Sequence, residues 1–293
     1  MKVALIQMAI REGQPKQNTK TVLALLEKAV LDEPDVIVLP EMWNTGYALS
    51  QLADLADDNG ERTKTLLRAF AKKHHVNIVA GSVATKKKDS FFNTTYVFDR
   101  TGQVIVDYDK IHLFGLMGED QFLQAGHQPS TFVLDGIQAA SVICYDIRFP
   151  EWIRTLMSGG AKVLFVVAEW PTERVAQWEI LLRARAVENQ AFVVAVNRVG
   201  KGDLDSFSGH SLVINPLGEV ILQVPDNQEG VFSTCLDWSE VEKVRGQIPV
   251  FADRKPPVVS LRRRADVFTI TDFTRFTQTI FRQFGGQGKC QAG

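Results

Sequence analysis

Cys144, Glu41, Lys110 and Glu119 carry side chains that could act together in covalent catalysis. A cysteine becomes a thiolate near neutral pH when a base or a cation lies beside it. A carboxylate can take that proton and later pass it to leaving ammonia, and a lysine ammonium can stabilise the oxyanion of a tetrahedral intermediate. We therefore predict that the cysteine attacks a carbonyl or nitrile carbon, with a carboxylate and a lysine assisting.

Each of these residues also has a simpler interpretation. A lone cysteine is most often a small buried apolar side chain. Glu41, after a Leu-Pro pair, could lie in a surface turn, and Lys110 and Glu119 could be solvated charges. Histidine is the usual base for a cysteine, and His112 is the one histidine that competes with the carboxylate. No other histidine follows a predicted strand, so we favour the set of cysteine, glutamate and lysine.

Buried strands are predicted to deliver three of the four side chains. Apolar runs predict strands at 35–40, 103–108 and 139–143. They lead into Glu41, Lys110 and Cys144, and functional groups of α/β proteins gather at the carboxyl ends of strands. Glu119 lies in 115–129, which has no clear periodicity and is predicted to be a long ordered loop.

The two halves of the chain repeat one order of predicted elements, in which strands alternate with helices and a hairpin follows. Further strands are predicted at 2–8, 76–83, 162–168 and 191–197, helices at 18–31, 61–75, 150–158 and 174–189, and hairpins at 94–108 and 211–221. No Pro/Gly/Ser-rich linker separates the halves. We therefore predict one α/β domain with two facing sheets and helices outside.

The last part of the chain has a different composition. Residues 254–264 contain two prolines, four arginines and a lysine. Residues 272–284 place aromatic and aliphatic side chains at helical spacing, and two glycines follow. We predict one main domain at 1–262 and a C-terminal extension at 263–293 with an amphipathic helix. That helix could dock on its own domain or on a partner subunit.

Bulk properties exclude several classes of partner. The net charge of −1 over 293 residues gives no bulk attraction to nucleic acid or to an anionic membrane, and no apolar run approaches the roughly 18 residues of a membrane span. The first residues lead directly into a predicted strand, so we expect no secretory signal and a cytoplasmic location. Three widely spaced cysteines argue against a disulfide framework or a metal site.

Three segments resemble the catalytic blocks of the nitrilase superfamily of carbon–nitrogen hydrolases. They are 39–42 (Leu-Pro-Glu-Met), 108–114 (Tyr-Asp-Lys-Ile-His-Leu-Phe) and 143–151 (Ile-Cys-Tyr-Asp-Ile-Arg-Phe-Pro-Glu). Further likeness occurs in 182–190 and 209–218, and the match covers residues 1 to about 255. The resemblance implies a four-layer αββα sandwich that is at least a homodimer, with no metal or organic cofactor.

The same resemblance implies a role for each candidate residue. Cys144 matches the nucleophile that forms a thioester, Glu41 the general base, and Lys110 the lysine that stabilises the oxyanion. Glu119 matches a second glutamate that orients substrate or water, and the choice between it and His112 for that supporting role stays open. The backbone N–H of Tyr145 would complete the oxyanion hole.

Within the superfamily, segments 144–151 and 168–178 are most similar to those of the omega-amidases. This implies that a small-molecule substrate, the terminal amide of a small 2-oxo-dicarboxylate monoamide, is hydrolysed with release of ammonia. Hydrolysis of an N-carbamoyl amine or of a nitrile is the alternative. An inactive binding scaffold is a more remote alternative, because all the expected catalytic residues are present.

The carboxylate of such a substrate needs a cation, and an arginine can bind a carboxylate with two parallel hydrogen bonds. Arg174 and Arg148 are the candidates. Arg148 could instead form a structural ion pair with Asp146 or Glu151. Two aromatic side chains could form the walls of the pocket, or could belong to the core as most aromatics do. They are Trp170 and Phe114.

Overall fold

The computed structural model describes residues 1–203 and 205–255. Met1–Ala252 form one compact unit. The predicted boundary at 262 and the helix predicted within 263–293 lie outside the described residues. The α-helices are α1 (Pro15–Ala29), α2 (Leu52–Leu55), α3 (Glu61–His74), α4 (Glu119–Phe122), α5 (Pro150–Met157), α6 (Val175–Asn189), α7 (Trp238–Gln247) and α8 (Val250–Asp253).

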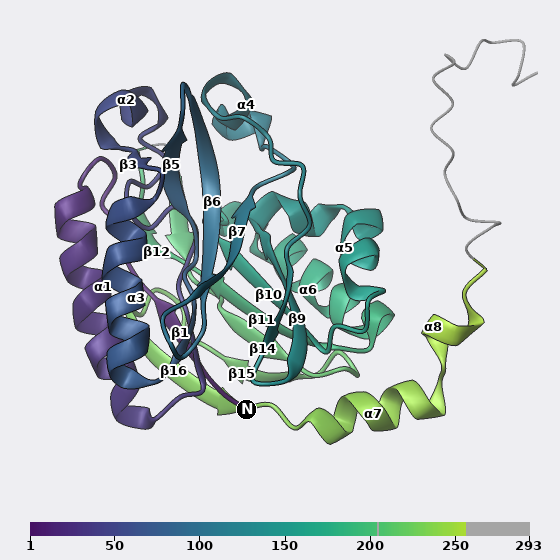
Figure 1. Cartoon of the computed structure of the whole chain (residues 1–293). Coiled ribbons are helices and arrows are strands. Elements are labelled where there is room, and N and C mark those ends of the chain that lie inside the picture. Colours follow the sequence, from purple (N-terminus) through teal and green to yellow (C-terminus); the bar gives the residue numbers. More distant parts are fainter. Residues whose placement is uncertain (204, 256–293) are drawn as a thin grey trace, which may run out of the picture. The chain divides into compact units, whose positions relative to one another are not determined.

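The strands of this unit form two large sheets (Figure 1). Within the described residues, the first sheet has the order β16-β1-β2-β4-β6-β5-β3 with β7 beside β6, and the second has the order β15-β14-β11-β10-β9-β8. The strands of the first sheet are β1 (Lys2–Gln7), β2 (Val36–Val38), β3 (Asp57–Asp58), β4 (Asn77–Val79), β5 (Val83–Lys87), β6 (Ser90–Phe98), β7 (Val104–Asp109) and β16 (Gly230–Cys235). Those of the second are β8 (Thr131–Leu134), β9 (Ile137–Ile143), β10 (Val163–Ala168), β11 (Phe192–Asn197), β14 (Leu212–Ile214) and β15 (Val220–Gln223), while β12 (Val199–Lys201) and β13 (Ser206–Ser208) pair separately.

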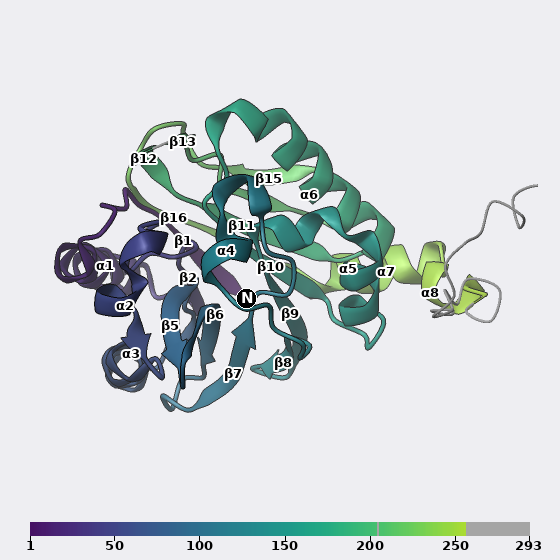
Figure 2. The same cartoon turned by 90° about the horizontal axis from the view of Figure 1, so that it is seen from above.

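Alternating side chains of the first sheet bury both of its faces. Val3 and Leu5 of β1 belong to the core between the sheets, together with side chains of β9, β10 and β11. Ala4 and Ile6 face the other way, into a second core with α1 and α3. Figures 1 and 2 show α1 and α3 outside the first sheet, and α5 and α6 outside the second. The predicted αββα sandwich of two facing mixed sheets is therefore confirmed.

Most predicted elements are present, and the differences have local causes. α1 begins at Pro15 rather than at 18, because proline is well suited to the first turn of a helix. The single strand predicted at 76–83 is wrong. Gly81 has a φ of 59° and turns the chain between β4 and β5, and a Cβ there would lie 1.9 Å from the carbonyl oxygen of Pro40. A glycine is therefore required beside the end of β2.

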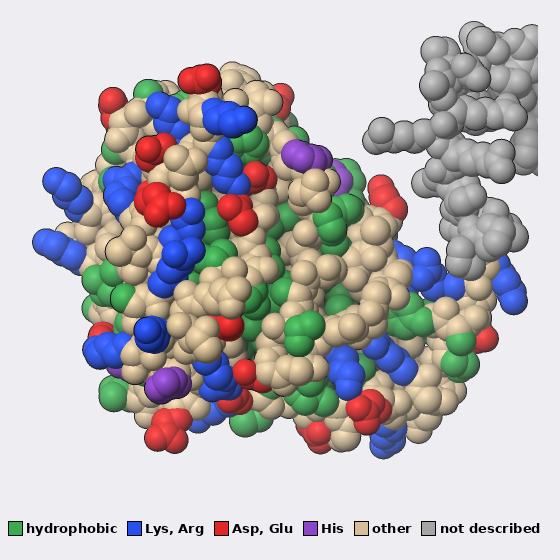
Figure 3. All heavy atoms as spheres, in the orientation of Figure 1, with side chains coloured by type: hydrophobic (Ala, Val, Ile, Leu, Met, Phe, Trp, Pro, Cys, Tyr) green, Lys and Arg blue, Asp and Glu red, His purple; other side chains and the backbone are tan. Residues whose placement is uncertain are grey.

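The stretch 115–129 was predicted to be a loop, but it contains two short helical segments. A 3₁₀ turn spans Gly115–Met117, and α4 begins at Glu119. The helices α3, α5 and α6 and the hairpins β6–β7 and β14–β15 lie close to their predicted positions. On the face in Figure 3, cationic and anionic side chains of the described residues are interspersed. Among the described helices, none has the length and apolar character that crossing a membrane requires.

Candidate active site

Cys144 lies at a sharp elbow between β9 and α5. It directly follows the last residue of β9 and begins a 3₁₀ turn, Cys144–Arg148, and α5 then starts at Pro150. Its φ of 45° is in the left-handed region, which is uncommon for a residue with a side chain and is often found at functional sites. The thiol is buried at the predicted strand-to-helix elbow.

Asp146 fixes the shape of this elbow. Its Oδ2 accepts hydrogen bonds from the backbone N–H of Ile143 at 3.0 Å and from the hydroxyl of Tyr108 at 2.7 Å. Its Oδ1 accepts from the backbone N–H of His112 at 3.0 Å and lies 2.7 Å from Nδ1 of the same residue. The His112 ring also stacks on Phe149. His112 thus supports the elbow through Asp146.

Glu41, Lys110 and Glu119 form a buried charge cluster beside the thiol. Glu41 follows β2, Lys110 follows β7, and all three side chains are fully buried. Nζ of Lys110 lies 2.8 Å from Oε1 of Glu41 and 2.8 Å from Oε2 of Glu119. Oε2 of Glu119 also accepts from the backbone N–H of Phe114 at 2.7 Å, which ties α4 to the preceding loop. The structure thus brings the predicted set together.

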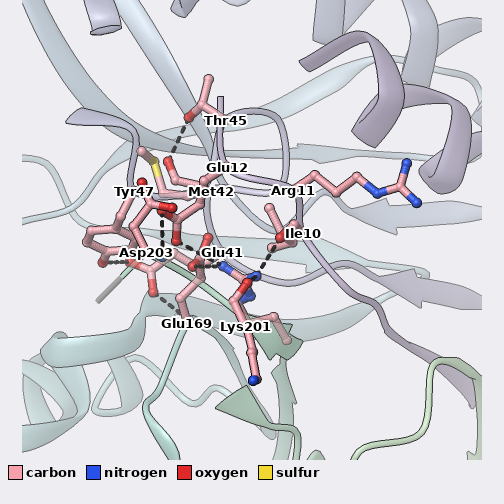
Figure 4. A network of polar contacts seen from close by, with 12 residues as sticks. Ile10, Arg11, Glu12, Glu41, Met42, Thr45, Tyr47, Glu169, Lys201 and Asp203 are labelled. Atoms are coloured by element: carbon pink, nitrogen blue, oxygen red, sulfur yellow. Dashed lines mark hydrogen bonds and ion pairs between the residues drawn. The ribbon is translucent and has the colours of Figure 1, made fainter. Parts of the chain in front are cut away.

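Tyr47 and Asn93 complete this cluster, and the sequence analysis missed both. The Tyr47 hydroxyl lies 3.0 Å from Oε1 of Glu41 (Figure 4) and 3.1 Å from Oε1 of Glu119. Nδ2 of Asn93 donates to the same two oxygens at 2.8 and 3.2 Å. Asparagine is disfavoured inside strands, so Asn93 in the middle of β6 was a signal that could have been used. No comparable sequence signal marks Tyr47.

The electrostatics keep the lysine charged and the cysteine neutral. Burial alone would lower the pKa of Lys110, but the carboxylates of Glu119 and Glu41 raise it well above its ordinary value. Burial raises the pKa of Glu119, an effect that Lys110 opposes and Glu41 reinforces. Burial, followed by the negative charge of Glu41, raises the pKa of Cys144 well above 9.0. The resting side chain is therefore a thiol, which needs a base to react.

Glu169 brings the second sheet into contact with this cluster, and it too was missed. It directly follows β10, and its backbone N–H donates to Oε2 of Glu41 at 2.7 Å. Its carbonyl oxygen lies 4.0 Å from Sγ of Cys144. Burial raises the pKa of the Glu169 side chain to about 8, although Arg198 opposes the rise. Glu169 follows a predicted strand, but its contact with Glu41 could not be predicted. That contact depends on how the two sheets face each other, which the end of one strand does not reveal.

A small pocket opens over the thiol. The predicted substrate-binding residues all line it together with Cys144, and they are Phe114, Tyr145, Trp170 and Arg174. The guanidinium of Arg174 lies 5.7 Å from the ring centre of Phe114, and its buried Nη1 has no hydrogen-bond partner among the described residues. The pocket is therefore lined by a guanidinium group with one nitrogen that has no hydrogen-bond partner among the described residues.

The predicted ion pair of Arg148 with Asp146 or Glu151 is wrong. Arg148 instead donates to Oε1 of Gln177 at 2.6 Å, and its guanidinium lies 4.8 Å from the ring centre of Trp170. Both oxygens of Asp146 already accept from backbone and side-chain donors at the elbow, and no ion pair with Arg148 forms. Arg148 is another lining residue of the pocket.

The described residues contain no group of three or more His, Cys, Asp or Glu side chains arranged to hold a metal ion. The described part of the site is therefore built from a thiol, carboxylates, an ammonium and guanidinium groups. A thiol beside a carboxylate and an ammonium can form and hydrolyse an acyl-enzyme without further groups.

Comparison with known proteins agrees with this chemistry. The family model described as carbon–nitrogen hydrolase matches residues 2–246. The chain is 46% identical to a 2-oxoglutaramate amidase of Bacillus subtilis over 86% of this chain and 96% of the relative. It is 36% identical to the omega-amidase YafV of Escherichia coli K12 over 75% of this chain and 84% of the relative.

A solved structure shows the same fold. The carbon–nitrogen hydrolase superfamily protein XC1258 of Xanthomonas campestris, which carries an arsenic adduct in its active site, superposes with a TM-score of 0.82 at 30% identity. The superposition covers 87% of this chain and 97% of that protein. Fold, site and sequence agree, and the chain therefore belongs to the carbon–nitrogen hydrolase family, as an amide-hydrolysing enzyme of its omega-amidase branch.

Proposed function

We propose that the enzyme hydrolyses the terminal amide of a small 2-oxo-dicarboxylate monoamide and releases ammonia and a carboxylate. The observation that carries this proposal is the pocket, which holds the thiol of Cys144 and the unpartnered guanidinium nitrogen of Arg174 together. A buried guanidinium nitrogen without a hydrogen-bond partner favours an anionic ligand. The 46% identity to a 2-oxoglutaramate amidase supports the same substrate class.

Substrate binding would use the two arginines and the aromatic walls. The remote carboxylate of the substrate would bind Arg174, with Arg148 adding a second positive charge on the Trp170 side of the pocket. Phe114 and Trp170 would exclude water from the carbon chain. This arrangement would hold the amide carbon over the thiol, and such positioning contributes a large part of the rate acceleration.

In the acylation step, the sulfur of Cys144 would attack the amide carbon while its proton moves to Glu41. A carbon–sulfur bond forms, and the electron pair of the C=O moves to the oxygen. Lys110 shares its three N–H donors between two carboxylates, and one of these donors would turn to this oxyanion, together with the backbone N–H of Tyr145. The carbon–nitrogen bond then breaks, and ammonia leaves with the proton that Glu41 held.

Deacylation would reverse the roles of the same groups. A water molecule attacks the thioester carbon while Glu41 takes one of its protons, and the proton returns to the sulfur as the carbon–sulfur bond breaks. Glu119 would orient this water, because it shares the ammonium of Lys110 with Glu41 and contacts the same tyrosine hydroxyl. The product is the dicarboxylate, and the thiol is restored.

The test is an ammonia-release screen over omega-amides of 2-oxo acids, N-carbamoyl amines and nitriles. We expect the 2-oxo-acid amides to turn over fastest. In Arg174→Met, KM for the carboxylate-bearing amide should rise about 100-fold, because a buried charge-assisted hydrogen bond is lost. A neutral amide of the same length is the matched control, and its KM should change less than about threefold. Faster turnover of carbamoyl amines or nitriles would refute the substrate assignment.

We also propose that the enzyme is at least a homodimer and works in the cytoplasm. Ile180 and Val187 are 67% and 51% exposed on one face of α6. Leu217 is 58% exposed and lies beside this face, because its neighbour Gly218 packs near the side chain of Val187. An exposed apolar patch on a helix layer supports association with a second copy. Free thiols at Cys144 and Cys235 are consistent with a reducing compartment.

A further inference from the structure

Glu169 and Arg198 form a fully buried ion pair at the edge of the second sheet. The neighbouring parallel strands β10 and β11 end at paired residues, Ala168 and Asn197, so the next residue of each strand lies at the same level. Oε2 of Glu169 is 2.7 Å from Nη1 of Arg198, and both side chains have no exposed surface. Glu169, one member of the pair, also carries the carbonyl oxygen that lies 4.0 Å from Sγ of Cys144.

Both members of the pair continue into contacts with the first sheet. The backbone N–H of Glu169 donates to Oε2 of Glu41, which follows β2. Nη2 of Arg198 donates to the carbonyl oxygen of Ile10, which follows β1, and to that of Lys201 at 3.3 Å. Figure 4 shows these contacts converging between the two sheets. The side-chain pair thus joins the ends of β10 and β11 to the segment after β1, while the backbone of Glu169 contacts Glu41 and faces the thiol.

The energetics favour a role in positioning over a role in stability. A buried ion pair often contributes no more to stability than apolar side chains of similar volume would. Glu169 is also incompletely satisfied, because its buried Oε1 has no hydrogen-bond partner among the described residues. The apolar core between the sheets is non-directional, so it cannot by itself fix the separation of two reacting groups. Directional contacts at the site can do so.

We propose that the Glu169–Arg198 pair is the positioning device that sets the base Glu41 against the thiol of Cys144, which belong to different sheets. Glu169 lines the thiol pocket, but its side chain is fully buried and acts in this role through its own peptide group rather than on the substrate. It holds the Glu169 peptide group, whose N–H binds Glu41 and whose carbonyl oxygen faces Sγ of Cys144. The inference rests on the proposed roles of these two residues in hydrolysis.

The test compares variants that remove the pair to different degrees. Glu169→Met removes the acceptor, Glu169→Gln keeps one acceptor oxygen without the charge, and Arg198→Lys keeps the charge without the fork that reaches both Glu169 and Ile10. Asp135→Asn is the matched control, because Asp135, between β8 and β9, pairs with Arg100 of the first sheet at 2.6 Å, away from the lining of the thiol pocket. Melting curves identify variants that fail to fold.

Two readouts are measured on the full-length enzyme. The first is the separate change of kcat and KM for the amide substrate. The second is the rate of alkylation of Cys144 by iodoacetamide, followed by mass spectrometry of peptides, with exposed Cys235 as the internal control in the same molecule. Alkylation also requires the thiol proton to leave, so it reports the coupling of base and thiol without turnover.

We expect kcat and Cys144 alkylation to fall together, by about 100-fold in Glu169→Met and about 10-fold in Glu169→Gln and Arg198→Lys, because sub-ångström misplacement of reacting groups has effects of this size. In the Glu169 and Arg198 variants, KM and the rate of Cys235 alkylation should stay within about threefold of the parent. In Asp135→Asn, kcat and the rate of Cys144 alkylation should also stay within about threefold. A parent that releases no ammonia but whose Cys144 alkylation still depends on Glu169 would refute the proposed function and support the pair.

Two results would overturn the inference. One is near-parental kcat and Cys144 alkylation in the folded Glu169 and Arg198 variants. The other is an equal loss in Asp135→Asn, which would indicate a general loss of stability. If Glu169→Met does not fold, the milder Glu169→Gln and Arg198→Lys variants decide the question by the same criteria.

Discussion

The protonation state of one sulfur atom determines how the reaction must begin. Burial and the charge of Glu41 raise the pKa of Cys144 well above 9.0, so the thiol keeps its proton to a higher pH than an ordinary cysteine. The enzyme therefore differs from cysteine hydrolases that store a preformed thiolate beside a cation. Here the proton must leave as the substrate is attacked, and a neighbouring carboxylate is the group that can take it.

This difference predicts a spectroscopic result. The ultraviolet difference spectrum between the parent and Cys144→Ser removes the signal of the other cysteines and isolates Cys144. We expect almost no thiolate absorbance near pH 8, where a thiol with an ordinary pKa would be about a quarter ionised. Full thiolate absorbance near pH 7 would contradict this prediction and remove the need for Glu41 in the first proton transfer.

At the scale of elements, the elbow between β9 and α5 depends on one carboxylate. Asp146 connects the end of β9 to the segment after β7 through the contacts with Ile143, Tyr108 and His112. Burial raises the pKa of Tyr108, so its hydroxyl stays protonated and can donate to Asp146. Asp146, two residues after Cys144, binds the N–H of Ile143, the residue before it. The left-handed backbone of Cys144 is therefore fixed between these two residues.

We predict that Asp146→Asn weakens both the fold and the reaction. An amide can replace only one of the two acceptor oxygens, so buried donors lose partners and the free energy of unfolding should fall by about 1–3 kcal/mol, measured by urea denaturation. The kcat should fall at least about 10-fold, because the sulfur loses its fixed position. Tyr108→Phe removes a single bond, and its effect on stability should be about 1 kcal/mol. Equal effects of the two variants would contradict this account of the elbow.

The sequence was most informative where strands end. The positions of Glu41, Lys110 and Cys144 could be predicted because the apolar runs before them are clear and the carboxyl ends of parallel strands meet at one edge. Tyr47 follows no strand end, and Asn93 lies inside β6, where its type was the only signal. Glu169 does follow a strand, but its contact with Glu41 depends on how the two sheets face each other, and no local pattern encodes that arrangement.

For the whole molecule, the exposed apolar face of α6 predicts the state of assembly. We expect light scattering to give at least a dimer for the parent and a smaller species for Val187→Asp, because a charge in an apolar interface lacks a partner. Val133→Asp, at a 54% exposed position on the edge strand β8, is the matched control and should leave the assembly unchanged. A monomeric parent, or an unchanged mass for Val187→Asp, would refute association through α6.

The two oxygens of Glu41 have unequal surroundings, and this makes proton transfer directional. Oε1 faces three donors, from Tyr47, Asn93 and Lys110, and so has no lone pair left. Among the described residues, Oε2 accepts from the backbone N–H of Glu169 alone, which leaves it a free lone pair. Protons of the thiol, of the leaving ammonia and of the attacking water must therefore all use the same oxygen. Oε2 of Glu41 would therefore accept and return every proton of the cycle. Whichever reactant lies beside Oε2 at a given step would determine which proton is transferred.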